Sequence, residues 1–343
     1  MVDLVLVVVL IMVMIAIIQN KIGEYNPMER NSTNSLRGFF AMIIILFHLS
    51  QQITSGMLFK VMGEMGYLAV AIFFCLSGYG LLTQFINTGG GYLTGFLQRR
   101  ISKVFIPWLF VSVIYLIYYY FMGGFKLIIG IVNQKQNGYL IIQNSWFIWV
   151  IIIFYVIFWG VFQRFSAGKA IVLVFIVTNI FAIIANALGL GVWWYYSGWA
   201  FSLGLLWKQY EEKIYYYINQ NYVLNLVLAI VAFFAAYVLR MVNKLTIHST
   251  LISILICLAA SSIFVIVILI ISMRLNIDNR TLRFLGSISL ELYLIHELIY
   301  ISLRSQWLWI KSDFVFVLLT LVFSIIVAYI LHVGLRRGMK RGN

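Results

Sequence analysis

Long apolar runs recur along the whole chain, separated by short polar segments. Most of them approach the twenty or so residues that a helix needs to cross the hydrocarbon of a membrane. The runs do not alternate apolar and polar residues as the strands of a membrane barrel would, so the pattern favours helices. We predict eleven transmembrane helices, of which the seventh is the shortest, at residues 2–18, 36–54, 65–86, 104–121, 145–162, 170–188, 193–207, 222–240, 251–273, 283–303 and 314–334.

Composition and charge point to the same fold class. Of the 343 residues, 63% are hydrophobic and only 10% are charged, whereas about 25% of the residues of a soluble domain are charged. The sequence therefore predicts an all-α polytopic membrane protein. Most of the 24 lysines and arginines fall in loops on one side of the predicted membrane, which places the N-terminus outside and the C-terminus in the cytoplasm. Topology accounts for the net charge of +14, and nucleic acid is not an expected partner.

We divide the chain into three parts. Residues 1–33 form an extra N-terminal transmembrane helix with a cytoplasmic linker, residues 34–334 form the membrane domain, and residues 335–343 form a basic cytoplasmic tail. The first apolar run has neither a basic n-region nor an A-x-A cleavage site, so we expect a retained helix rather than a signal peptide. Cys75 and Cys257 lie inside apolar runs, where they are expected to be small buried residues. No metal-ligand spacing is present, and no metal is expected.

Two ionisable side chains share one face of the second predicted helix. Arg37 and His48 are eleven residues apart, which is about three helical turns or roughly 16 Å along the axis. Gln51, Gln52 and Ser55 continue this polar face outward. Because an ionisable residue inside a membrane costs free energy, it is by default a candidate functional residue. Two simpler alternatives stay open: Arg37 anchors the helix at the headgroups, and His48 is satisfied by a neighbouring helix.

The tenth predicted helix carries a second polar face. Spacings of three and four residues place five side chains on it: Gly286, Ser289, Tyr293, His296 and Tyr300. His296 lies at a depth close to that of His48, which predicts a shared buried cavity. Glu291 points away from this face. It is protonated, paired with a basic residue, or facing a second wet surface.

Two further groups of candidate residues lie between these helices. Ser77 sits among small residues on the third predicted helix, where such residues either allow close helix packing or leave room for a ligand. Arg99, Arg100 and Lys103 follow on the predicted cytoplasmic side. This basic cluster is either an anchor for lipid headgroups or a phosphate-binding patch, for which the planar guanidinium is well suited.

Four motifs resemble, in order, those of the acyltransferase-3 family of integral-membrane acyltransferases, which modify sugar hydroxyls of bacterial surface glycans and some small molecules. The segment with Arg37 and His48, LRGFFAMIIILFHLS, resembles the opening helix of the family. The other three are GYLAVAIFFCLSGYGL, similar to an FFxxSG helix, FLQRRISKVFIPW, similar to a basic segment before a proline, and SLELYLIH, similar to a near-terminal SxxxYLxH segment. NSWFIWV is a looser match. The resemblance spans about residues 34 to 334, and the helix before Asn34 is additional to the usual ten.

The resemblance implies an enzyme that moves an acyl group, most often acetyl, from cytoplasmic acyl-CoA to a hydroxyl of a cell-surface or lipid-linked sugar. It also implies a multi-pass protein of the bacterial cytoplasmic membrane, in contact with membrane lipids. Acetyl-CoA or another acyl-CoA is then a co-substrate, and no cofactor is bound permanently. A transporter or flippase for a glycan or lipid precursor is the alternative, since buried histidines and a polar track suit that class too.

Each candidate residue has an expected role in acyl transfer. The CoA phosphates are expected to bind the basic side chains of Arg37, Arg99, Arg100 and Lys103. A neutral imidazole can remove a hydroxyl proton near pH 7, so His48 is expected to be the general base, or else to carry the acyl group briefly. Negative charge that develops on the thioester carbonyl is expected to be stabilised by Tyr293, Ser77 or His296.

Overall fold

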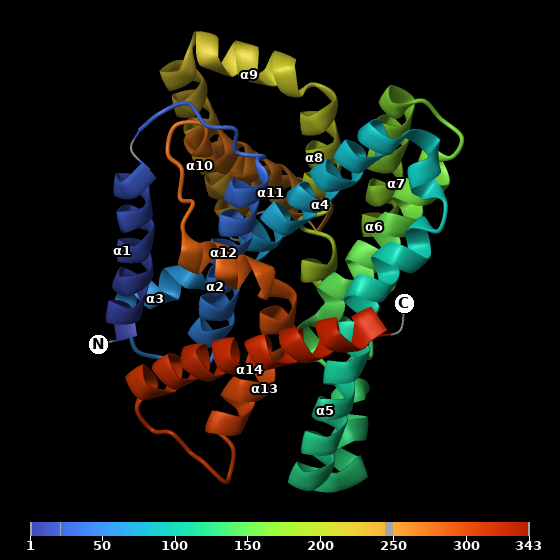
Figure 1. Cartoon of the computed structure of the whole chain (residues 1–343). Helices are drawn as coiled ribbons and strands as arrows, with labels where there is room; N and C mark the ends of the chain where they lie inside the picture. Colours follow the sequence, from blue (N-terminus) through green and yellow to red (C-terminus); the bar gives the residue numbers. More distant parts are fainter. Residues whose placement is uncertain (1, 21, 244–249, 342–343) are drawn as a thin grey trace.

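The computed structural model describes residues 2–20, 22–243 and 250–341, so the last two residues of the predicted basic tail lie outside the described residues. Within these ranges the regular structure is helical, and the only strand-like pairing is an isolated bridge between Ile22 and Leu275. The α-helices, shown in Figure 1, are α1 (Val2–Asn20), α2 (Arg30–Ser50), α3 (Met57–Met62), α4 (Gly66–Thr88), α5 (Phe96–Val132), α6 (Trp146–Phe162), α7 (Ala167–Ala187), α8 (Trp199–Gln209), α9 (Glu211–Gln220), α10 (Tyr222–Val242), α11 (Thr250–Ser272), α12 (Arg280–Ser287), α13 (Ser289–Leu303) and α14 (Asp313–Arg341).

The described residues contain nine helices that are long and apolar enough to cross a membrane. A tenth span is obtained if α12 and α13, which meet at a bend of 76°, are counted together. These helices correspond to ten of the eleven predicted runs, and the protein is an all-α, multi-pass membrane protein. The topology with the N-terminus outside remains a prediction.

The seventh predicted helix, 193–207, is not a full-length span. It consists of a 3-10 turn at Val192–Trp194 followed by α8, which has only 11 residues. Even so, α8 runs antiparallel to α4: the Ser197 hydroxyl donates to the Tyr67 carbonyl at one end (2.6 Å), and the Tyr79 hydroxyl donates to Glu211 just beyond the other end (2.8 Å). The segment of residues 192–209 therefore runs back along α4 in the predicted direction, but only part of it is helical.

The helix observed in place of the predicted helix 104–121 is longer: α5 begins at Phe96 and continues to Val132. It is interrupted at Gly123 and Gly124, which have non-helical backbone angles. Gly124 has a φ of 62°, in the left-handed region that glycine adopts without steric cost. The chain therefore changes direction at this pair, inside α5, and Figure 1 shows the bend in this helix.

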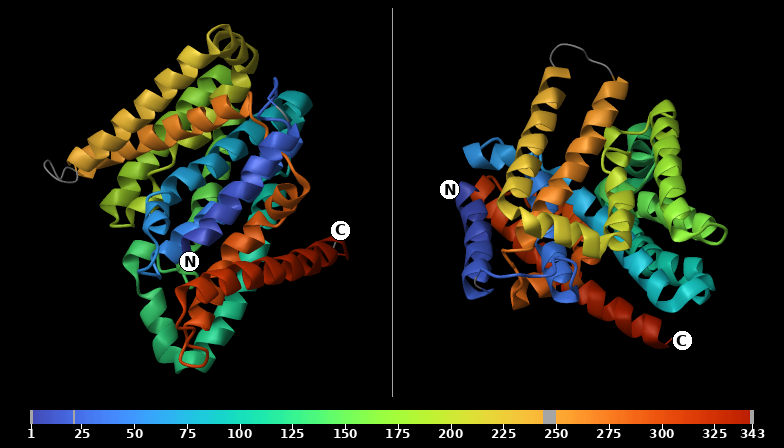
Figure 2. Two further views of the ribbon diagram at one scale, coloured as in Figure 1. Left: turned by 90° about the vertical axis from the view of Figure 1, so that its left-hand side faces the viewer. Right: turned by 90° about the horizontal axis from the view of Figure 1, so that it is seen from above.

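Helix α2 is the central helix and α10 the most peripheral. Of their candidate spans, 72% is buried for α2 and 6% for α10. Figure 2 shows α10 and α11 side by side as a hairpin at one edge of the bundle. At the centre, α2 and α12 touch backbone to backbone: a Cβ on Gly38 would lie 2.0 Å from the Leu282 carbonyl, and one on Gly286 would lie 2.0 Å from the Asn34 carbonyl. These two glycines allow α12 to pack directly against α2.

Candidate active site

Two cavities open on the polar face of α2. The first, called here the Arg37 cavity, has a volume of about 250 Å³. The second, called the His48 cavity, has a volume of about 280 Å³. Both lie where α2 packs against α4 and α13, and the side chains at the two ends of its polar face, Arg37 and His48, each line one of them.

The Arg37 cavity is lined by cations, hydroxyls and apolar side chains from α2, α4, α5, α6 and α13. Its polar lining residues are Arg37, Ser77, Arg100, Tyr155, Ser289 and Tyr293. Among the described lining residues there is no carboxylate, so the positive charge of the two guanidinium groups is not neutralised inside the cavity. An uncompensated pair of arginines suits a bound anion.

The His48 cavity has a different lining. Amides and aromatic side chains surround His48, and the charged residues present, Glu64 and Arg240, are paired with each other at 2.5 Å. The Arg240 guanidinium also lies over the Tyr67 ring, 5.0 Å from its centroid. The other polar or aromatic lining residues are Phe47, Gln51, Asn137, Gln143, Asn144, Trp146, Trp193, Tyr196 and Tyr293.

The two cavities meet at three side chains. Ile44 on α2, Val70 on α4 and Tyr293 on α13 line both of them. The Tyr293 hydroxyl donates a hydrogen bond to the Asn144 carbonyl, which fixes the ring at this junction. These three side chains therefore mark the place where the two cavities adjoin.

His48 and His296 lie next to each other, with ring centroids 5.1 Å apart. His48 is 8% exposed and lines its cavity, whereas His296 is fully buried behind it and does not. The Nδ1 atom of His296 lies 3.2 Å from the Leu292 carbonyl. A carbonyl only accepts, so Nδ1 carries the proton and Nε2 is left as an acceptor. In the described structure Nε2 is buried and has no hydrogen-bond partner.

The predicted basic cluster is divided by the fold. Arg100 lines the Arg37 cavity and donates to the Tyr92 hydroxyl at 2.5 and 3.0 Å. Arg99 instead points to the turn before α5, where it donates to the carbonyls of Tyr92 (2.7 Å) and Thr94 (2.5 Å). Lys103 is exposed and lines neither cavity. Of the three, only Arg100 is placed beside Arg37.

A family model described as an acyltransferase domain matches residues 30–333. The chain belongs to the acyltransferase-3 family. No curated protein and no solved structure matches it. With its apolar helices, the protein is therefore a membrane acyltransferase, and α1 lies outside the matched region.

The acyltransferase also has cavity residues that the sequence alone did not single out. Tyr155 is the only hydroxyl-bearing residue of α6, and its side chain interacts with that of Ser77 in the Arg37 cavity. A lone tyrosine in an otherwise apolar run is a signal that could have been noticed. The pairing of Glu64 with Arg240 had no such signal, because it joins residues 176 positions apart.

The acidic residues of α13 in the acyltransferase have separate partners. Glu291 lies 2.8 Å from Nδ1 of His332 on α14, so of the three alternatives the structure supports pairing with a basic residue. Glu297 is 3% exposed and accepts a hydrogen bond from the backbone N–H of Asn144 at 3.3 Å. Together with Tyr293, it ties the segment before α6 to α13.

Proposed function

We propose that this acyltransferase moves an acyl group, most often acetyl, from acyl-CoA bound at the Arg37 cavity to a hydroxyl of a sugar bound in the His48 cavity. The observation that carries the proposal is the meeting of the two cavities at Ile44, Val70 and Tyr293, with two arginines and no carboxylate among the described lining residues of one and a buried histidine in the other. The sugar belongs to a cell-surface or lipid-linked glycan, and the protein acts in the bacterial cytoplasmic membrane.

The donor is expected to enter from the Arg37 end of α2, the predicted cytoplasmic side. Arg37 and Arg100 are the cations that can hold a CoA phosphate, since guanidinium groups bind phosphate in a bidentate manner. Arg99 and Lys103 have no side chain in the cavity and are proposed only as outer contacts for the nucleotide part. The thioester then reaches the junction beside Tyr293.

His48 acts on the acceptor. As a general base it takes the proton of the sugar hydroxyl, whose oxygen attacks the thioester carbonyl carbon. The tetrahedral intermediate breaks the carbon–sulfur bond, and the CoA thiolate receives the proton from His48, so that no proton is consumed overall. His48 can also carry the acyl group itself before passing it to the hydroxyl. Detection of an acyl-enzyme distinguishes the two routes.

His296 is proposed to position His48. Its bare Nε2 is available to accept an N–H from the neighbouring His48 ring, which would leave the other His48 nitrogen free to act as the base. Two imidazolium ions this close in a buried site would repel each other strongly, so at most one ring is charged during a cycle.

The oxyanion is assigned to the junction, where Tyr293 is the hydroxyl-bearing side chain that lines both cavities, whereas Ser77 and Tyr155 line the Arg37 cavity alone. The Tyr293 hydroxyl donates to the Asn144 carbonyl in this structure, and in this role it would exchange that acceptor for the thioester oxygen. A buried, preorganised donor stabilises developing negative charge better than water does. The side chains at the junction also exclude water, which favours transfer over hydrolysis of the thioester.

The test uses membranes from cells that express the protein, incubated with acetyl-labelled acetyl-CoA. Wild type is expected to place label in the glycan or lipid-linked sugar fraction, and His48→Ala is expected to abolish it at matched protein level. His332→Ala is the matched control, because this histidine lines neither cavity and pairs with Glu291. Full transfer by His48→Ala would remove the proposal, whereas unmodified substrate crossing the membrane would favour the transporter or flippase alternative.

A further inference from the structure

Helix α1 lies outside the matched acyltransferase domain, yet both of its ends are bonded to that domain. Figure 1 shows it along the flank of the bundle, with its start near α3. One stripe of α1 packs against the protein, and the opposite stripe is exposed, as expected for a helix that faces lipid on one side. The buried residues of the stripe are Val2, Val5, Leu6, Val9 and Ala16.

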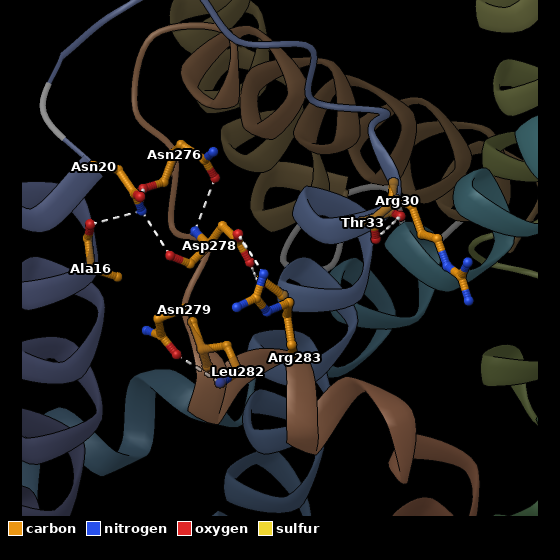
Figure 3. Close-up of polar contacts among 10 residues, drawn as sticks. Ala16, Asn20, Arg30, Thr33, Asn276, Asp278, Asn279, Leu282 and Arg283 are labelled. Carbon is orange, nitrogen blue, oxygen red and sulfur yellow. Dashed lines mark hydrogen bonds and ion pairs between the residues drawn. The ribbon is translucent and has the colours of Figure 1, made fainter.

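The end of α1 at Asn20 is held by the segment between α11 and α12. The Asn20 amide donates to the carbonyl of Asn276 (3.0 Å) and to that of Asp278 (2.7 Å), and Figure 3 shows the bond to Asp278. The Asp278 carboxylate in turn accepts from Ser35 on α2 (2.7 Å) and from Arg283 on α12 (3.2 Å). This end of α1 is therefore tied to the Arg37 half of α2.

The end of α1 at Asp3 is held by α3. The two carboxylate oxygens of Asp3 accept the backbone N–H groups of Met57 (3.1 Å) and Phe59 (2.9 Å). The first N–H groups of a helix have no partner within it, and the residue before α3, Gly56, has no side chain to supply one. Asp3 therefore caps the start of α3, although it belongs to α1.

Helix α3 leads directly into the wall of the His48 cavity. Its last turn continues through hydrogen bonds from Gly63 to the Lys60 carbonyl and from Glu64 to the Val61 carbonyl. Gly63 and Glu64 line the cavity, and Glu64 holds Arg240. A six-residue helix held at its start by Asp3 thus supports, at its end, the paired charges beside His48.

We propose that α1 positions the acceptor-side wall of the acyltransferase, with Asp3 as the positioning residue that acts through α3 and Glu64. This rests on the proposed function, in which the acceptor sugar binds in the His48 cavity. If α3 loosens, only a fraction of the molecules presents the complete wall, and apparent affinity for the acceptor falls by that fraction. Among the residues that the structure describes, none from α1, α3 or the segment that joins α3 to α4 lines the Arg37 cavity.

The first readout does not depend on activity. Hydrogen exchange of purified full-length protein is measured over residues 57–64 in wild type, Asp3→Ala and Asp3→Asn. We expect exchange in this segment to be about fivefold faster in Asp3→Ala, the size expected for a lost helix cap, and intermediate in Asp3→Asn, whose amide carbonyl keeps one of the two acceptor oxygens. Asn20→Ala is the matched control, because it loosens the other end of α1 and should leave residues 57–64 unchanged. Equal exchange in wild type and Asp3→Ala would overturn the proposal.

The second readout is kinetic. Label transfer is followed while either acetyl-CoA or acceptor membranes are varied. A fivefold shift of the α3 equilibrium lowers the competent fraction by at most fivefold, so Asp3→Ala should raise the half-saturating amount of acceptor by up to about fivefold and leave that of acetyl-CoA unchanged. An equal rise in both would mean that Asp3 only supports the overall fold, and this contradicts the proposal. If wild type transfers no label, the proposed function fails, and hydrogen exchange alone decides whether Asp3 positions α3.

Discussion

The Arg37 cavity and the His48 cavity lie along one helix but offer opposite chemistry. The first holds two arginines with no carboxylate among its described lining residues, whereas the second pairs its arginine with Glu64, and its other polar lining groups are amides, indoles, phenols and His48. Free positive charge suits a phosphate-bearing donor. A wall of neutral hydrogen-bonding groups and aromatic faces suits a polyhydroxylated acceptor. The difference suggests how one face of α2 serves two substrates.

The largest expected effect comes from His48, in the cavity proposed for the acceptor. His48→Gln keeps hydrogen-bonding capacity but cannot carry a proton, so transfer should fall at least a hundredfold, within the range of about 10²–10⁴ for general acid–base catalysis. Initial rates of label transfer at saturating acetyl-CoA measure it. A loss below tenfold would mean that His48 binds the acceptor without acting on its proton.

The next effect separates the two arginines of the basic cluster. Arg100→Gln should raise half-saturation for acetyl-CoA about tenfold, because a hydrogen bond to a charged group contributes about 1.5–3 kcal/mol. Arg99→Gln is the matched control: its side chain is occupied by the carbonyls of Tyr92 and Thr94, so a change of less than threefold is expected. Equal increases in half-saturation for the two variants would mean that Arg99 and Arg100 bind phosphate together, in a single patch.

A stability effect of similar size is expected where α2 meets α12. Gly38→Ala places a Cβ 2.0 Å from the Leu282 carbonyl, and overpacking of this kind costs about 1–3 kcal/mol. The fraction of protein that stays monodisperse after heating in detergent should fall. Gly80→Ala, where no atom lies within 4 Å of the added Cβ, should behave as wild type. Equal stability of the two variants would show that α2 and α12 can separate without cost.

The smallest effect concerns the acceptor wall. Glu64→Gln should raise half-saturation for the acceptor about threefold to fivefold and leave that for acetyl-CoA unchanged, since a partly exposed ion pair contributes only up to about 1 kcal/mol. The exchange of both charges, Glu64→Arg with Arg240→Glu, should restore part of the loss. A change on the acetyl-CoA side instead would contradict the division between the cavities.

The sequence predicted the features that depend on local pattern. Apolar length predicted ten of the spans, and helical spacing placed Arg37 and His48 on one face and His296 at the depth of His48. Prediction from the sequence failed where the local structure or the placement of a side chain depends on helices distant in the sequence. The run 193–207 was predicted as a full helix because its composition is apolar, but α4 holds it as a turn and a short helix. Arg99 and Arg100 are indistinguishable in sequence, and only the turn before α5 decides which one reaches the cavity. The partners of Glu64 and Asp3 likewise arise from packing alone.

The division of the two substrates is tested most directly by protection of introduced cysteines. Ser77→Cys lies in the Arg37 cavity and Gln51→Cys in the His48 cavity, while the native Cys75 and Cys257 are buried. The rate of labelling by a water-soluble maleimide is measured in purified protein with and without CoA. We predict that CoA slows labelling of Ser77→Cys severalfold and leaves Gln51→Cys unchanged. Protection of Gln51→Cys without protection of Ser77→Cys would contradict the assignment of the Arg37 cavity to the donor.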